Sequence, residues 1–206
     1  SVKALDNDGN IAYVSSGPAS LLGVFVSSRP TPPSDLMGRA VSPSILNWEW
    51  QDKGGNETGY RLMASTGGVL SGNLPVNTTF FLLQNLPGPN TSYAVYAEAF
   101  NTFWISSTTV VSTFTFANPP NNLALVSISS DTITASWGPN SNPVIITSYT
   151  LEVSSFSSYS AIASSSGTLI NRAADAGLNP NTSYFYRVKS FNGALLESGS
   201  TVSIDT

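Results

Sequence analysis

An internal repeat constrains this chain more than any other feature. The residues Pro-Asn-Thr-Ser-Tyr occur at positions 89–93 and again at 180–184, which is 91 positions later. Asn101 is followed by Asn192 at the same spacing. Such a period indicates one structural unit per repeat, so we expect two units of about 90 residues each.

Each unit has the residue pattern of β-strands. Apolar side chains alternate with other residues at Leu46, Trp48 and Trp50, and alternation of this kind is typical of a half-buried strand. About seven such strands per unit, with turn residues roughly every 8 to 12 positions, are typical of an antiparallel β-sandwich. The sequence therefore predicts an all-β chain of successive antiparallel sandwiches.

The order of the landmarks resembles the immunoglobulin-like fibronectin type III domain, twice over, across residues 30–206. The motif is Pro-Pro, then Trp, then Tyr, then Pro-Asn-Thr-x-Tyr and a closing Asn. The resemblance assigns Trp50 and Trp137 to strand B, Tyr60 and Tyr149 to strand C, and Tyr93 and Tyr184 to the tyrosine corner, whose hydroxyl bonds back to the backbone. Trp48 is an extra indole that faces the same core. Residues 56–60 and 117–120 also resemble long arrays in bacterial surface proteins.

The expected domains are residues 30–117 and 118–206. Residues 2–6 resemble the end of strand F, and residues 20–26 read as strand G, so residues 1–29 are expected to form the C-terminal hairpin of a partial repeat. An isolated hairpin is marginal in water. Either the sequence is part of a longer array, or another chain completes the hairpin by strand addition.

Composition excludes several classes of function. The chain has no histidine and no cysteine, which rules out disulfides, thiol nucleophiles, Ser/His/Asp triads and His or Cys zinc sites. A net charge of −4 speaks against nucleic acid as a partner, and no apolar run is long enough for membrane insertion. We therefore expect no enzyme activity and no cofactor.

Two acidic segments were weighed as sites. Residues 6–10, Asp-Asn-Asp-Gly-Asn, match the start of a calcium loop but lack its closing carboxylate, so a tight hairpin turn is favoured and no metal is expected. Glu49, Asp52 and Glu57 are the local carboxylate cluster. Strand alternation places Glu49 in solvent, and the other two belong to a loop expected to be solvated, so a glycosidase pair is not favoured.

The candidate contact residues are apolar side chains in the loop between strands F and G of each repeat. Packing between domains and contact with a ligand both remain open as their role. Apolar residues of the N-terminal hairpin need a cover, and a neighbouring chain would supply it. These candidate interface residues are Ile11, Tyr13, Leu21, Leu22, Phe25, Phe103, Trp104, Leu195 and Leu196.

The linkers and the surface suggest a function. Proline in residues 30–33 and 119–120 favours stiff connections, and a surface rich in Ser, Thr and Asn is common in secreted proteins. We expect a semi-rigid extracellular or cell-surface rod with a structural or adhesive role, including a self-assembling filament subunit. Its partners are neighbouring repeats or copies of the chain, or a protein or glycan ligand. The alternatives are a spacer or carbohydrate-binding module of a secreted polysaccharide-degrading enzyme, and a receptor-like binding module.

Overall fold

The computed structural model describes residues 2–5, 11–14, 28–198 and 203–205. The chain divides into two compact units. The first unit is Ser1–Met37, Trp48–Phe81 and Ala94–Val111, and the second is Gly38–Asn47, Leu82–Tyr93 and Ser112–Thr206. The second unit therefore includes turns and strand ends that precede residue 118. The domain boundaries at residues 30 and 118 stay a prediction.

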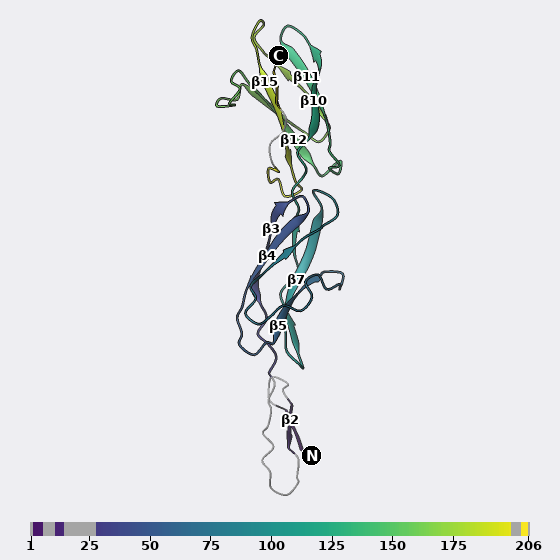
Figure 1. The fold of residues 1–206 in the computed structure, drawn as a ribbon, viewed down its shortest axis with the longest axis vertical. Helices are drawn as coiled ribbons and strands as arrows, with labels where there is room; N and C mark the ends of the chain where they lie inside the picture. Colours follow the sequence, from purple (N-terminus) through teal and green to yellow (C-terminus); the bar gives the residue numbers. More distant parts are fainter. Residues whose placement is uncertain (1, 6–10, 15–27, 199–202, 206) are drawn as a thin grey trace. The chain divides into compact units, whose positions relative to one another are not determined.

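Every regular element of the described residues is a β-strand, which confirms the all-β fold class (Figure 1). In chain order the strands are β1 (Val2–Leu5), β2 (Ile11–Val14), β3 (Ser34–Ser42), β4 (Ile45–Gln51), β5 (Gly59–Ala64), β6 (Phe80–Leu83), β7 (Ser92–Phe100), β8 (Ile105–Ser107), β9 (Val111–Phe114), β10 (Asn121–Ile128), β11 (Thr132–Gly138), β12 (Ser148–Ser154), β13 (Ser164–Thr168), β14 (Arg172–Ala176), β15 (Phe185–Phe191) and β16 (Ser203–Asp205). The described residues include no helix that could cross a membrane.

The N-terminal hairpin consists of β1 and β2. The two strands pair antiparallel, with Leu5 opposite Ile11 and Lys3 opposite Tyr13. The expectation that Ile11 and Tyr13 lie in a loop is wrong, because β-branched and aromatic residues favour strand pairing and both residues are part of β2. Leu21, Leu22, Phe25 and the acidic turn at 6–10 lie outside the described residues.

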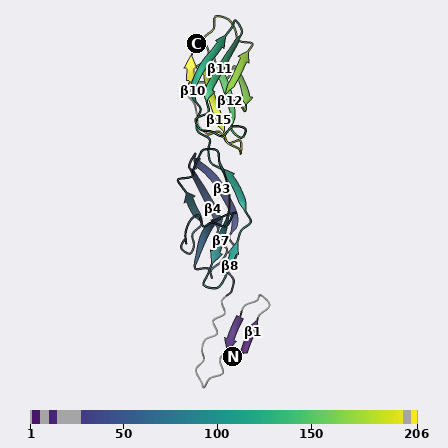
Figure 2. The ribbon, with the colours of Figure 1, turned by 90° about the vertical axis from the view of Figure 1, so that its right-hand side faces the viewer.

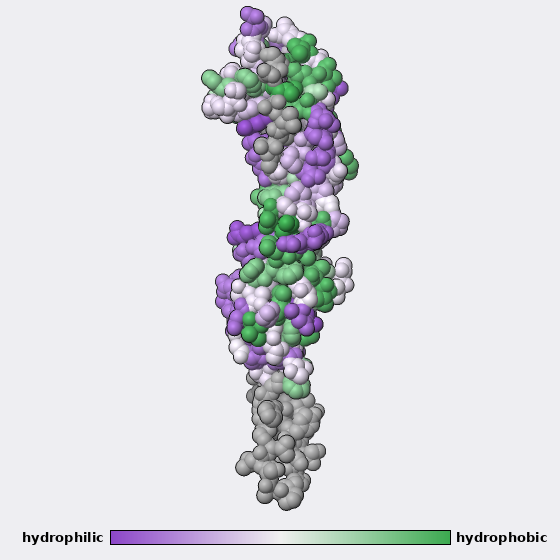
Figure 3. All heavy atoms as spheres, in the orientation of Figure 1, coloured by the Kyte–Doolittle hydropathy of each residue, from purple (hydrophilic) through white to green (hydrophobic). Residues whose placement is uncertain are grey.

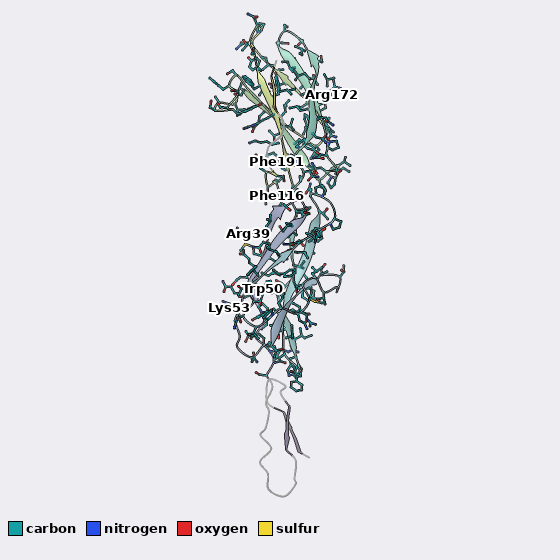
Figure 4. All side chains as sticks on the ribbon, in the orientation of Figure 1. Arg39, Trp50, Lys53, Phe116, Arg172 and Phe191 are labelled. Atoms are coloured by element: carbon teal, nitrogen blue, oxygen red, sulfur yellow. The ribbon has the colours of Figure 1, made fainter. Side chains whose placement is uncertain are left out.

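Strands β3 to β9 form two sheets, one in the order β3-β4-β6 and one in the order β5-β7-β8, with β9 also paired to β7. On β4, Leu46, Trp48 and Trp50 are buried while the residues between them are only partly covered. The Trp50 ring, labelled in Figure 4, lies 6.0 Å from the Tyr60 ring on β5. The alternation predicted for β4 is confirmed, and Trp48 does face the same core.

Strands β10 to β16 form the second sandwich, from sheets β10-β11-β14 and β13-β12-β15-β16 (Figure 2). The Trp137 ring on β11 lies 5.7 Å from the Tyr149 ring on β12, so an indole and a phenol bridge the sheets here as they do at Trp50 and Tyr60. The buried core is Leu123, Ile133, Ala135, Trp137, Tyr149, Leu151, Val153, Leu178, Tyr184, Tyr186 and Val188.

Both Pro-Asn-Thr-Ser-Tyr turns have a tyrosine hydroxyl bonded to nearby backbone, as the resemblance implied. The Tyr93 hydroxyl donates to Pro87 O at 3.5 Å, and the Asn179 backbone N–H donates to the Tyr184 hydroxyl at 3.0 Å. Tyr184 is buried, whereas Tyr93 is only partly buried and contributes less to the core than expected.

Candidate functional site

Of the carboxylates near Tyr60, Glu57 is buried and Asp52 is partly buried. Burial raises the pKa of Tyr60, and a hydrogen bond with Asp52 and the charges of Asp52 and Glu57 raise it further. Glu57 is 8% exposed, so the expectation of a solvated loop is wrong at this residue. A phenol with a raised pKa stays protonated at neutral pH and donates a hydrogen bond rather than acting as a base. Across the described ranges, no group of three or more acidic side chains could hold a metal ion.

Phe103 and Trp104 lie between β7 and β8, in the first unit. Phe103 is 70% exposed, whereas Trp104 is partly buried and has the guanidinium of Arg29 over its ring, 5.5 Å from the centroid. This cation–π contact occupies one face of the indole. Phe103 is thus the aromatic side chain of this loop that remains accessible.

The remaining candidates are spread over other parts of the fold. Leu195 and Leu196 follow β15 in the second unit and are exposed, at 75% and 49%. On the face drawn in Figure 3, green hydrophobic residues are interspersed with purple hydrophilic ones. The role of the candidate residues as contact sites stays a prediction.

Asn101, at the end of β7, organises the loop that contains Phe103. Its Oδ1 accepts hydrogen bonds from the backbone N–H groups of Phe103 and Trp104, at 3.0 and 2.9 Å. Its Nδ2 donates to the backbone carbonyl of Ser28 at 2.9 Å. One carboxamide therefore closes the loop and attaches it to the segment that leads into the first strands.

Asn192, 91 residues later, makes a similar set of contacts in a loop that is one residue longer. Its Oδ1 accepts from the N–H groups of Ala194 and Leu196, at 3.0 and 2.9 Å. Its Nδ2 donates to the carbonyl of Thr115 at 3.2 Å, and both residues are completely buried. Because Thr115 lies 87 residues after Ser28, the contact recurs at the period of the sequence repeat.

Asn90 adds a second buried carboxamide to this region. Its Nδ2 donates to Thr147 Oγ1 at 2.8 Å, and its Oδ1 accepts from the Gly193 N–H at 2.7 Å. Its φ of 47° is in the left-handed region, which asparagine tolerates better than most residues. Its own N–H donates to the carbonyl of Phe116, labelled in Figure 4.

We call Asn90, Thr115, Thr147, Asn192 and Gly193 the asparagine cluster. All five residues belong to the second unit. The side chains of its asparagines and threonines are at most 1% exposed, and each makes at least one hydrogen bond within the cluster or to adjacent backbone. No member is charged, so screening by salt leaves these bonds unaffected. Chemically, the cluster can fix four chain segments in one arrangement, and it contains no acid, base or nucleophile.

The segment that follows Thr115 is held by a further set of hydrogen bonds. Asn118 and Asn142 exchange two bonds, from Asn118 N to Asn142 Oδ1 at 2.7 Å and from Asn142 Nδ2 to Asn118 O at 2.8 Å. The Ala117 N–H donates to Ser198 Oγ at 2.9 Å, and Asn140 Nδ2 donates to Pro119 O at 2.8 Å. This linker is fixed by hydrogen bonds as well as by its prolines.

Gly193 is required by close packing. A Cβ built on Gly193 would lie 2.5 Å from a ring carbon of Phe114, closer than nonbonded carbon atoms approach. The missing side chain allows the Gly193 N–H to reach Asn90.

Sequence reasoning had noted Asn90, Asn101 and Asn192 as repeat landmarks but had assigned them no function. It had missed Thr115, Thr147 and Gly193 altogether. A useful signal was present, because Asn closes strand F in both repeats and a strand-closing carboxamide is able to bond the backbone of its own loop.

Comparison with known proteins agrees with the β-sandwich architecture. The family model described as fibronectin type III domain matches residues 118–204. A two fibronectin type III domain segment from chicken tenascin has a TM-score of 0.53 and 22% identity, over 85% of this chain and 99% of that one. The FN1-FN3 domains of chicken CNTN1 have a TM-score of 0.40 and 18% identity, over 86% of this chain and 66% of that one.

A search of curated protein sequences found no match to the chain. The tenascin segment supports the fold alone, since its identity is low, and the family model supports the assignment of the C-terminal sandwich. Residues 118–204 therefore match the fibronectin type III family model, and the chain has the fibronectin type III fold.

Proposed function

We propose that this chain is a non-enzymatic, extracellular structural module in which two fibronectin type III domains, residues 30–117 and 118–206, are joined through an ordered, hydrogen-bonded linker. Its role is that of a spacer between the parts attached to it. The fold alone leaves function open, since fibronectin-like sandwiches serve many purposes. The proposal depends on how the linker and its neighbours are bonded.

The observation that supports it most is the burial of Asn90. Both atoms of its carboxamide bond to residues beyond the linker, Thr147 and Gly193, and the side chain is fully buried. A flexible linker needs none of these contacts, and buried polar groups are costly unless they are satisfied. An ordered linker accounts for their presence.

Extracellular location is part of the proposal. The surface is rich in hydroxyl and amide groups, and charged residues are only 10% of the sequence, a composition common in secreted β proteins. The cluster is uncharged, so its bonds would persist through changes of salt outside the cell.

Backbone ¹⁵N relaxation of the 206-residue chain tests this function. We expect residues 34–114 and 121–198 to report one common rotational correlation time. Asn90→Gly removes the carboxamide and keeps the left-handed backbone accessible, so the two sets of residues should then tumble separately. Asn181→Gly is the matched control, because Asn181 has a similar φ of 55° and lies outside the cluster. Independent tumbling of the unmodified chain would contradict the proposal.

A further inference from the structure

The chain contains two Pro-Asn-Thr-Ser-Tyr turns and two asparagine-closed loops, and the structure pairs one turn with one loop. The turn at Asn90 bonds to the loop that starts at Asn192, through Gly193. Within the described residues the turn at Asn181 and the loop that starts at Asn101 have no such pairing, although they correspond in sequence to the paired turn and loop.

The turn at Asn181 has the sequence of the turn at Asn90 and a similar φ at its asparagine, but a different environment. The φ angles are 55° and 47°, and the five residues are identical. Asn90 is fully buried, whereas Asn181 is exposed. Among the residues that the structure describes, nothing bonds to the Asn181 carboxamide.

The surface beside Asn181 is hollowed and partly apolar. An open cavity of about 360 Å³ is lined by residues that include Ile133, Leu178, Asn181 and Tyr184. Ile128, also in the lining, is 64% exposed. A free carboxamide beside uncovered apolar side chains is a surface that a complementary loop can bind.

The loop at Asn101 presents the complementary groups. Thr102 lies 91 residues before Gly193, and in the described part of the chain its backbone N–H has no acceptor. Thr58 lies two residues before Tyr60, as Thr147 lies two residues before Tyr149. Both Thr58 and Thr102 are exposed. The N–H and the hydroxyl that bind Asn90 in the asparagine cluster thus have accessible equivalents.

The substitution of Thr102 for Gly193 is compatible with this pairing. Gly193 has to be glycine because the Phe114 ring occupies the place of a Cβ. In the second repeat the counterpart of Phe114, 91 positions later, is Asp205. Asp205 has no ring that would exclude a Cβ. A threonine is therefore acceptable opposite the turn at Asn181.

We propose that the turn at Asn181 binds Thr58 and Thr102 of a second copy of this chain, in the way that Asn90 binds Thr147 and Gly193 within one copy. This inference rests on the proposed function, because it reuses the asparagine cluster between molecules. The two surfaces differ, so the contact is heterologous, and each copy that binds leaves one further surface of each kind available.

Sedimentation velocity of the 206-residue chain over a concentration series tests the proposal. Within one chain a linked contact experiences an effective concentration of about 1 mM, so the series has to reach about 1 mM. We expect the mean mass to rise continuously with concentration. Asn181→Gly should weaken association about tenfold or more, which corresponds to about 1.4 kcal/mol. Asn77→Gly is the control, since Asn77 is exposed with a φ of 60° and belongs to neither surface.

Mixing two blocked variants makes the test specific. Thr102→Pro removes the N–H from the loop, and Asn181→Gly removes the carboxamide from the turn. At concentrations where each variant alone is monomeric, an equal mixture should form dimers and nothing larger, because one surface of each kind survives. If Thr102→Pro fails to fold, Thr58→Val removes the matching hydroxyl instead.

Three outcomes would overturn the proposal: an unmodified chain that is monomeric at about 1 mM, association unaffected by Asn181→Gly, or a mixture that grows beyond dimers. The last two would indicate a different interface. The proposed function is tested separately, because ¹⁵N relaxation of the Asn181→Gly monomer still reports whether the two domains tumble together. A monomer whose two domains tumble together but which does not associate would contradict this inference and leave the proposed function standing.

Discussion

The backbone N–H of Gly193 donates a 2.7 Å hydrogen bond to Oδ1 of Asn90, across 103 residues of sequence. Asn90 is fully buried, and its Nδ2 is used by Thr147 at the same time. The bond therefore cannot be exchanged for one to water without opening the surrounding packing. The packing of the asparagine cluster therefore depends on one uncharged side chain, that of Asn90.

Replacing Asn90 should destabilise the second unit. Asn90→Gly leaves the Gly193 N–H without its acceptor and the Thr147 hydroxyl without a donor, and an unsatisfied buried group costs about 1–3 kcal/mol. Chemical denaturation should show a lower free energy of unfolding for the transition of the second unit. Asn181→Gly, at the equivalent but exposed position of the second Pro-Asn-Thr-Ser-Tyr turn, should change it far less. Equal effects of the two variants would refute the role given to the cluster.

Any side chain at residue 193 should destabilise the fold, because the ring of Phe114 occupies the space that a Cβ would need. Gly193→Ala places a methyl group 2.5 Å from the ring of Phe114, so the loop or the ring has to move and the Asn90 bond lengthens. Thermal unfolding should show a clear loss of stability in Gly193→Ala. In a double-mutant cycle, Phe114→Ala should remove most of the added penalty. Additive losses would mean that the ring does not set the requirement for glycine.

The strands and the core were predictable from the sequence because their signals are local. Alternation over seven residues placed Leu46, Trp48 and Trp50 on the buried face of β4, and the same reasoning placed Trp137 on the core face of β11. A strand has a period of two, so a few residues are enough to determine which side chains face inward.

The asparagine cluster was not predictable in the same way. Asn90 and Asn181 are in identical five-residue turns, with similar φ angles, yet one is buried and the other exposed. The difference comes from partners 57 and 103 residues away, at Thr147 and Gly193. Local sequence determines the conformation of the turn, whereas its burial depends on what packs against it. Glu57 was misjudged for the same reason, since loop residues of polar type are usually exposed.

Removing the core tryptophan of the C-terminal domain should unfold that domain selectively. Trp137 is 5% exposed and packs on Tyr149, and truncation of a buried tryptophan costs about 3–5 kcal/mol. Differential scanning calorimetry of Trp137→Ala should show loss or a large downward shift of one transition. Trp104→Ala, at a partly buried loop position, is the control and should shift melting much less. Unchanged melting of Trp137→Ala would mean that the assigned strand register is wrong.

Stability should fall in alkaline solution because buried tyrosines keep their protons in the folded state. Burial raises the pKa of Tyr60, with a further contribution from its hydrogen bond to Asp52, and burial also raises the pKa of Tyr186. In the unfolded chain a tyrosine titrates near pH 10, so up to about pH 9 these phenols are protonated in both states and contribute no pH dependence.

Above about pH 10 the unfolded chain releases these protons while the folded chain retains them. The unfolded state then binds fewer protons, so the free energy of unfolding decreases as pH rises, by up to about 1.4 kcal/mol per pH unit for each such tyrosine. Denaturation at pH 8, 9, 10 and 11 should show a plateau followed by a decline. Tyr186→Phe removes one titrating group and should make the decline less steep, whatever its effect at pH 8. A decline of equal steepness in Tyr186→Phe and the unmodified chain would show that this buried phenol is not responsible.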